Sequence, residues 1–246
     1  MQARSLLSHT ALSLLLACLT PTIGLAAPLF EATYKGEYAN LNITMTRTLS
    51  RNGNDYHLTS KAKSFMAKIN ESSDFSLTKN TLRPHRYLYE RKIFGVKKKE
   101  QLTFDWGSLV ANYTKGNDHE GAQPLNKNSL DPTLYQLQLQ RDLAQNPDQK
   151  TFNYTFVRRN QTKQYHFKRS DNAGLTFKGK QYSAIVVIRT GDGDKETKLW
   201  LIPELNYTLA KIRHTDEDGD TNEVLLTDYS STDAFKQFLQ AAPLIQ

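Results

Sequence analysis

Residues 182–213 read YSAIVVIRTGDGDKETKLWLIPELNYTLAKIR, and this stretch decides the fold class. Its first eight residues are rich in β-branched side chains, which is typical of a buried strand. The turn cluster 191–194 and Pro203 delimit a second strand, because proline cannot donate a ladder hydrogen bond. After a short corner at 204–206, residues 207–213 place alternate side chains on opposite faces of a third strand. Three successive antiparallel strands form a meander, which predicts a large antiparallel sheet.

Most of the chain beyond residue 27 continues this pattern. Period-two alternation predicts further strands, among them 30–38, 87–93 and 101–106. Asn52-Gly53-Asn54 is typical of a hairpin turn. Residues 114–129 are polar, contain glycine and show no period, so they are predicted to form a mobile loop.

One segment has the signals of a long helix. Asp131 stands before Pro132, which gives an N-cap followed by proline at the first helical position. Leucines supply apolar contacts along the segment until Asn146-Pro147 ends it. A short helix at 233–239 is predicted to begin after Ser231 or Thr232.

These elements predict a mainly β protein. The expected fold is a large curled antiparallel sheet or half-open barrel of about eleven strands, with one long helix and a short C-terminal helix. A flat sheet of this width would leave long edges exposed, so the sheet should curl around the long helix and leave an apolar hollow. Residues 27–246 show no internal repeat and no domain boundary, and are predicted to form a single β-rich half-barrel domain.

The first 26 residues follow the order of regions in a secretory signal peptide. Arg4 precedes a short apolar run at 11–17, too short to span a bilayer, and small residues lead to a predicted cleavage after Ala26. A second interpretation stays open, because Leu15-Leu16-Ala17-Cys18 resembles a lipobox in which Cys18 would be lipidated. Simple cleavage is favoured, and we expect a periplasmic protein. Since Cys18 is the only cysteine, the exported domain would have no disulfide.

The formal net charge is +7, and two segments, 83–100 and 158–169, are strongly basic. Adjacent hairpins would join them into a positive patch; the alternative is an ordinary solvated sheet face. For an exported protein, the expected partners of such a patch are anionic membrane surfaces or lipopolysaccharide phosphates, not nucleic acid. The predicted anionic-surface residues are Arg91, Lys92, Lys97, Lys98, Lys99, Arg158 and Arg159.

Phe94 and Val96 mark a hairpin tip beside three lysines. Two interpretations are open: the tip enters a membrane, or Phe94 folds back onto the sheet. The second is favoured.

No motif of an established catalytic, metal or cofactor site is present, so none of these is predicted. The run Asp216–Asp220 suggests calcium, but Thr221 and Thr227 stand where an EF-hand needs glycine and glutamate, and a solvated turn is favoured. Asp105 beside Trp106 could be a general acid in an apolar pocket. The simpler interpretation is a strand carboxylate that points outward.

Several segments, taken in order, resemble one family. Trp200–Tyr207 and the following Ala210–Arg213 are similar to the closing signature of domain of unknown function 3108, a family of uncharacterised bacterial envelope proteins. Residues 30–34, residues 104–106 and the Asp131 helix resemble further parts of that family. A proline common in the family is replaced here by leucine at 209, which bears on a turn. More distantly, the curled sheet around a helix resembles periplasmic lipoprotein carriers of the LolA/LolB type, a likeness that implies acyl chains held between sheet and helices.

The favoured hypothesis is an exported periplasmic protein that is not an enzyme. It would bind an apolar or lipidic ligand, such as a lipoprotein acyl chain, in the curled sheet. One form of this hypothesis places the protein at the outer membrane. The predicted lining residues are aromatic: Tyr87, Tyr89, Phe104, Trp106, Trp200 and Tyr207. The alternative is an envelope scaffold or adaptor that binds another protein or peptidoglycan. An enzyme is a third hypothesis, without a visible catalytic constellation.

Overall fold

The computed structural model describes residues 27–38, 41–78, 81–190 and 195–241. The predicted signal peptide with Cys18 and the turn cluster 191–194 lie outside these residues. The described part of the chain forms sixteen strands, two α-helices and one 3-10 turn.

The N-terminal half of the sheet consists of β1 (Phe30–Tyr38), β2 (Leu41–Asn52), β3 (Asp55–Lys63), β4 (Ala67–Leu77), β5 (Leu82–Ile93), β6 (Val96–Asp105), β7 (Val110–Lys115) and β8 (Asp118–Pro124). The C-terminal half consists of β9 (Ser129–Leu130), β10 (Thr151–Arg158), β11 (Gln161–Arg169), β12 (Ala173–Phe177), β13 (Lys180–Thr190), β14 (Glu196–Ile202), β15 (Thr208–Thr215) and β16 (Thr221–Ser231). The helices are α1 (Leu134–Gln145) and α2 (Asp233–Gln240), and Pro203–Leu205 forms the 3-10 turn η1.

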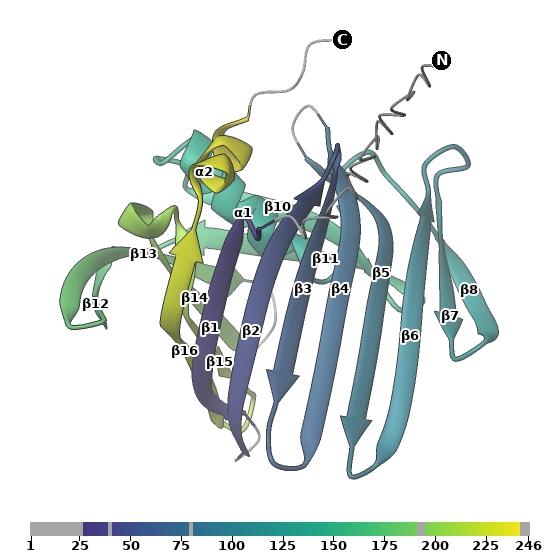
Figure 1. Ribbon diagram of the computed structural model, residues 1–246, viewed down its shortest axis with the longest axis horizontal. Helices are drawn as coiled ribbons and strands as arrows, with labels where there is room; N and C mark the ends of the chain where they lie inside the picture. The colour runs from purple at the N-terminus through teal and green to yellow at the C-terminus, as the bar shows by residue number, and fades with distance from the viewer. Residues whose placement is uncertain (1–26, 39–40, 79–80, 191–194, 242–246) are drawn as a thin grey trace, which may run out of the picture.

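The strands form one sheet in the order β8-β7-β6-β5-β4-β3-β2-β1-β16-β15-β14-β13-β11-β10-β9, with β12 paired to β13. Only the short β9–β10 pair is parallel among the pairs described. The sheet curls around α1 but its path ends at β8 and β9, so it is not a closed barrel (Figure 1). The predicted class, a curled β-sheet with one long and one short helix, is therefore confirmed.

The two halves of the sheet join where the first strand pairs with the last. β1 lies between β2 and β16, and Phe30 is opposite Ser231. At Gly36 the backbones come so close that a Cβ would lie 2.0 Å from the carbonyl oxygen of Glu223. Only glycine fits at this position of the join.

The far ends of the two halves are bridged by side chains. The turn between β10 and β11 carries Arg159, whose Nε lies 3.2 Å from Oε2 of Glu100 on β6. In the same turn, Asn160 accepts a 2.9 Å hydrogen bond from the Gln123 amide on β8. These contacts fix the curvature without a backbone ladder.

The predicted count of about eleven strands was too low. The segment 114–129, expected to be a mobile loop, contributes the end of β7, all of β8 and the start of β9. β8 is an edge strand whose side chains are mostly exposed, so its residues need no apolar alternation to form a ladder with β7. Gly116, with φ of 63°, makes the tight turn between these two strands.

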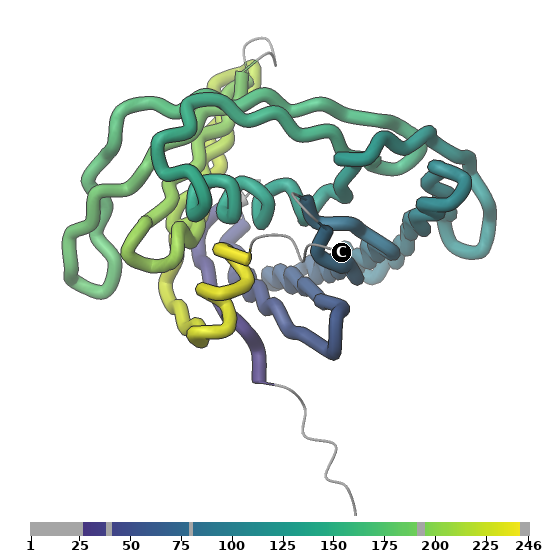
Figure 2. Tube along the Cα trace, turned by 90° about the horizontal axis from the view of Figure 1, so that it is seen from above, coloured from purple at the N-terminus to yellow at the C-terminus, as the bar shows by residue number. Residues whose placement is uncertain are grey.

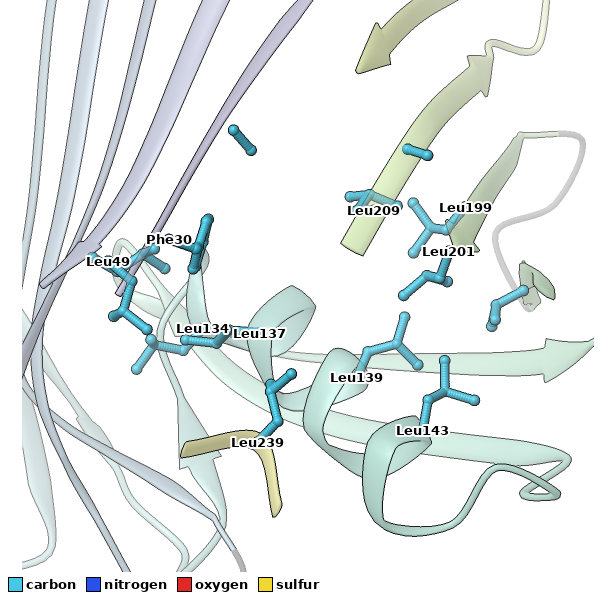
Figure 3. Close-up of a cluster of buried hydrophobic side chains, with 14 of the residues drawn as sticks. Phe30, Leu49, Leu134, Leu137, Leu139, Leu143, Leu199, Leu201, Leu209 and Leu239 are labelled. Carbon is cyan, nitrogen blue, oxygen red and sulfur yellow. The ribbon is translucent and has the colours of Figure 1, made fainter. Parts of the chain in front are cut away.

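Helix α1 fills the inside of the curl and holds both halves of the sheet (Figure 2). In Figure 3, Leu134 and Leu137 lie toward Phe30 and Leu49 of the N-terminal half. On the other side of α1, apolar side chains lie toward β14; these are Leu139 and Leu143, near Leu199 and Leu201. The helix is therefore the common core of both halves.

The start of α1 is stabilised by Asp131, but the predicted start was two residues too early, because α1 begins at Leu134 with Thr133 at the N-cap position, and Pro132 lies in the preceding turn. Its carboxylate Oδ1 accepts hydrogen bonds from the backbone N–H groups of Thr133, at 2.8 Å, and Leu134, at 3.0 Å. Oδ2 accepts a hydrogen bond from the Ser73 hydroxyl on β4. Asp131 is completely buried, and this burial raises its pKa from 3.8 to about 6 although the hydrogen bonds oppose the shift.

Asp131→Asn is expected to remove a pH dependence from the stability. The folded carboxyl keeps its proton at pH values where the unfolded carboxyl has lost it, so the wild-type free energy of unfolding falls as pH rises from about 4 to about 6, by up to roughly 3 kcal/mol. The asparagine oxygen accepts the same backbone hydrogen bonds, and its amide donates to Ser73. Relative to wild type, the variant should therefore gain stability at pH 7 and not at pH 4, as measured by urea unfolding.

Asp105→Asn is the matched control, because this carboxylate also caps a turn but is exposed. Hydrogen bonds from Ser108 and Gly107 lower its pKa, so its neutralisation should give no gain at pH 7. Parallel pH profiles for wild type and Asp131→Asn would contradict the assignment.

The apolar hollow expected beside the long helix is occupied by side chains at two places. On α1, Tyr135 stacks on Phe156 and Phe167 of β10 and β11, with ring centroids 5.6 and 6.0 Å apart. At the open end of the curl, α2 inserts Phe235 and Phe238 against the N-terminal half. The concave face is thus packed with aliphatic and aromatic side chains.

Candidate functional site

Two neighbouring hairpin tips expose apolar side chains at the end of the sheet opposite α2 (Figure 1). Phe65, in the turn between β3 and β4, is 97% exposed. Phe94 and Val96, at the turn between β5 and β6, are each 70% exposed. The backbone N–H of Phe94 donates to the carbonyl of Met66 at 3.1 Å, which joins the two turns. We call Ser64–Met66 together with Phe94–Val96 the apolar tip.

The favoured expectation that Phe94 folds back onto the sheet was wrong. Its backbone has φ of 48°, and the following Gly95 has φ of 84°, so the two form a tight hairpin turn that aims the ring outward. Asparagine or glycine suits the first of these positions, and a phenylalanine there costs about 1 kcal/mol. The turn geometry therefore does not explain why this residue is aromatic.

A row of lysines crosses four strands immediately behind the apolar tip. In the strand register, Lys63 of β3 is opposite Lys68 of β4, Lys68 is opposite Lys92 of β5, and Lys92 is opposite Lys97 of β6. Directly opposed residues share one face of a sheet, so the four ammonium groups lie side by side. All four side chains are exposed, and none forms an ion pair within the described residues.

This lysine row works against stability. Like charges placed directly opposite one another in a sheet repel, and such pairs are normally avoided. Three consecutive opposed pairs lie next to exposed aromatic rings, so this surface combines a local excess of positive charge with apolar side chains. A shallow groove of about 330 Å³ runs between the two turns, lined by Phe65, Met66, Phe94 and the stems of Lys68 and Lys92.

The other predicted anionic-surface residues are less available. Lys98 and Arg159 both contact the buried carboxylate of Glu100, and Lys99 lies 3.7 Å from Glu90. Burial alone would raise the pKa of Glu100, but the hydrogen bonds and charges of Lys98 and Arg159 outweigh it and hold that pKa below its ordinary value. Arg91 is half-buried on β5. Arg158 is exposed, but it lines a pocket on the inside of the curl together with Glu71 and Glu100.

The predicted lining residues do not meet around one cavity. Tyr87 and Tyr89 line a pocket of only about 40 Å³, whose other walls include Glu71, Glu100 and Arg158. The Tyr87 hydroxyl donates to Glu71 at 2.5 Å, so this pocket is polar and has room for little more than water.

The remaining four lining candidates do not line that pocket, although Phe104 and Trp106 pack in the same apolar cluster as Tyr87 and Tyr89. Phe104 stacks on Trp106, whose indole N–H donates to the Pro84 carbonyl at 2.7 Å. Trp200 is buried on β14 beneath Lys211, and Tyr207 is half-buried after η1 with φ of 54°.

Asp105 does not lie in an apolar pocket. Its carboxylate is exposed and accepts hydrogen bonds from the backbone N–H groups of Gly107 and Ser108 in the β6–β7 turn. The acidic segment Asp216–Asp220 forms the turn between β15 and β16. Within the described residues, no three histidine, cysteine, aspartate or glutamate side chains gather in a metal-binding group.

Sequence reasoning missed Phe65, Lys63 and Lys68. The signal was available, because Lys63-Ser64-Phe65-Met66-Ala67-Lys68 repeats the arrangement around Phe94, an apolar turn enclosed by lysines. Neither α1 nor α2 is long and apolar enough to cross a membrane.

A family model covers most of the chain. The family model described as "Protein of unknown function (DUF3108)" matches residues 30–227, which span the sheet from β1 into β16 and include α1 and the apolar tip. No curated protein matches the chain.

Proposed function

The chain belongs to the DUF3108 family of proteins of unknown function, and on that premise we propose that it is a non-enzymatic cell-envelope protein that docks on an anionic membrane surface through the apolar tip. The observation that carries the proposal is the combination of Phe65 and Phe94 with the unpaired row of four lysines behind them.

The energetics of this surface favour a membrane over a soluble partner. Burying an aromatic side chain in an apolar phase stabilises by about 1.5–3 kcal/mol, and each lysine near anionic headgroups adds about 1 kcal/mol. Each ring stands two or three residues beyond the lysines of its hairpin, so the rings would reach the acyl region while the ammonium groups meet phosphates.

Phe94→Asn is expected to weaken binding to vesicles of phosphatidylglycerol and phosphatidylethanolamine by about tenfold, because the buried ring is lost. Asparagine suits the left-handed backbone at this position, so the free energy of unfolding should stay the same or rise. Vesicle co-sedimentation and urea unfolding measure the two effects separately.

The matched control is Leu109→Asn. Leu109 is also an exposed apolar residue in a left-handed turn, with φ of 56°, but it lies between β6 and β7, away from the apolar tip. Its replacement should leave vesicle binding unchanged. Equal binding by wild type and Phe94→Asn would refute membrane insertion of the tip.

The second part of the proposal concerns export and cargo. Residues 1–26, with their signal-peptide pattern, support delivery to the periplasm, with Cys18 lipidation as the alternative anchor. The aromatic lining of the concave face supports an apolar or lipidic ligand, but α1 and α2 occupy that face, so a ligand must displace one of them. The turn-capping role of Asp105 supports a non-enzymatic protein.

An envelope scaffold or adaptor is the second candidate. The observation that favours it is the position of β8 at one end of the sheet. Asn160 contacts this strand at Glu120 and Gln123, and the rest of its outer edge could pair with a strand of another protein. Crosslinking to one abundant protein, without vesicle binding, would favour this candidate over membrane docking.

A further inference from the structure

Helix α2 packs on the open end of the curl as an apolar wedge. Its buried face consists of Phe235, Phe238 and Leu239. Phe235 lies 4.7 Å from Phe30, measured between ring centroids, and Phe238 lies 4.9 Å from Tyr56 in the same measure. The opposite face of α2 is exposed. Its eight residues thus fill a groove whose walls belong to β1, β3 and α1.

Arg141 of α1 lies at the closed end of this groove and is only 1% exposed. Its Nη1 donates to the Phe238 carbonyl at 2.8 Å, and Nη2 donates to the Ala241 carbonyl at 3.4 Å. Its Nε is buried without a hydrogen-bond partner. Burial lowers the pKa of Arg141 to about 10.

The buried guanidinium has no carboxylate partner among the described residues. The adjacent Asp142 accepts hydrogen bonds from Tyr154, at 2.6 Å, and from Gln138, at 2.7 Å, and forms no ion pair with Arg141. An isolated buried charge is costly. Here the compensation comes from two carbonyl groups at the C-terminal end of a helix, from the Phe238 ring, whose centroid lies 5.1 Å from the guanidinium carbon, and from the charge of the nearby Asp142. A carboxylate would satisfy Arg141 better, because it accepts two parallel hydrogen bonds from a guanidinium.

Helix α2 therefore presents two features together. One side of the helix is apolar, and its C-terminal carbonyl groups carry a partial negative charge that faces the buried Arg141. An acyl chain with an anionic head has the same two features in the same order. In the structure, Arg141 binds the carbonyl end of α2, and the rings of Phe30, Tyr56 and Phe75 contact its apolar side.

We propose that α2 occupies the binding site of a long-chain acyl carboxylate, whose chain replaces Phe235, Phe238 and Leu239 and whose head group binds Arg141. The ligand binds the conformation in which α2 has left the groove. This inference rests on the cargo part of the proposed function and is independent of docking by the apolar tip.

The test uses the full chain and the fluorescent fatty acid cis-parinaric acid, with hexadecanol as a competitor of similar length that has no carboxylate. Phe238→Ala and Arg141→Gln both loosen α2, but only the first keeps the guanidinium. Phe238→Ala should bind the probe at least tenfold more tightly, because less binding energy is needed to release α2. Arg141→Gln should bind at least tenfold more weakly than wild type, and hexadecanol should compete at least tenfold less well than palmitate.

Tryptic cleavage at Lys236 reports whether α2 leaves the groove. Lys236 lies within α2, so cleavage requires the helix to open, and palmitate should accelerate it. Cleavage at Lys63, in an exposed hairpin, should not change. Protection of Lys236 by palmitate, or equal affinity of wild type and Arg141→Gln, would overturn the inference.

Failure of the inference differs from failure of the proposed function. If palmitate binds but Lys236 stays protected, the ligand lies elsewhere and only the α2 site is refuted. If no fatty acid binds, the α2 site and the cargo proposal are both refuted, and vesicle binding through the apolar tip is still decided by Phe94→Asn.

Discussion

Replacement of the whole lysine row by glutamine is expected to weaken binding to anionic vesicles by about a thousandfold. The variant carries Lys63→Gln, Lys68→Gln, Lys92→Gln and Lys97→Gln. Each lysine near the surface contributes about 1 kcal/mol, so four contribute about 4 kcal/mol, and 1.4 kcal/mol corresponds to a factor of ten. The effect should shrink as salt is added, because exposed charges are screened. Co-sedimentation with phosphatidylglycerol vesicles over a salt series measures both.

The same variant should be at least as stable as wild type. The lysines repel one another across three strand pairs, and glutamine removes this repulsion without removing an ion pair. Unfolding in urea therefore separates a loss of binding from a loss of fold.

A second quadruple variant controls for net charge. Lys150, Lys163, Lys168 and Lys180 are exposed lysines of the C-terminal half, away from the apolar tip. Their replacement by glutamine lowers the net charge by the same amount and should weaken vesicle binding far less. Equal losses in the two variants would show that overall charge, not the lysine row, determines binding.

Phe75→Ala is expected to lower the free energy of unfolding by about 3–5 kcal/mol. Phe75 on β4 is completely buried, and its ring centroid lies 5.4 Å from that of Tyr56 and 6.4 Å from that of Phe238. Its loss leaves a cavity where the N-terminal half meets α2, and rigid strands on both sides prevent collapse. Urea unfolding followed by circular dichroism measures the change.

Phe65→Ala is the control for this substitution. It removes the same side chain from the turn at the start of β4, but Phe65 is 97% exposed and contributes no packing. Its free energy of unfolding should equal that of wild type within about 0.5 kcal/mol. A Phe75→Ala variant that unfolds at the wild-type urea concentration would contradict the core assignment.

The fold class follows from local sequence, because strands with one buried face keep a period of two and the turns between them contain glycine, asparagine or proline. The helix after Asp131 is signalled locally in the same way. The structure confirms the fold class and the helix, which begins at Leu134 and not at the predicted Pro132. β8 could not be predicted, since both faces of this edge strand are largely exposed and its ladder depends only on the backbone of β7.

The site was predictable in part. The basic hairpin around Phe94 is visible in the sequence, but its exposure depends on the left-handed turn that the structure reveals. The lysine row is a product of strand register: its four members come from two hairpins, and only the pairing of β4 with β5 brings Lys68 beside Lys92. No spacing within one segment encodes this.

The six aromatic lining candidates fall into two separate parts of the sheet. Tyr87, Tyr89, Phe104 and Trp106 pack in one apolar cluster, whereas Trp200 and Tyr207 belong to another. Tyr87 belongs to β5, whereas Trp200 belongs to β14, on the other side of the join between β1 and β16. Helix α2 has a visible apolar face in the sequence, yet its position against Arg141 depends on contacts between residues about a hundred positions apart. A contact between residues so far apart in the sequence leaves no pattern within either segment that would predict it.

The join between β1 and β16 has a consequence for biogenesis. Each half of the sheet can assemble from neighbouring hairpins as the polypeptide emerges, but β1 and β15 keep naked edges until residues 221–231 arrive to fill the space between them. The sheet is therefore incomplete until residues 221–231 have been synthesised, and until then the two unpaired strand edges are open to association with other chains unless a holdase chaperone covers them.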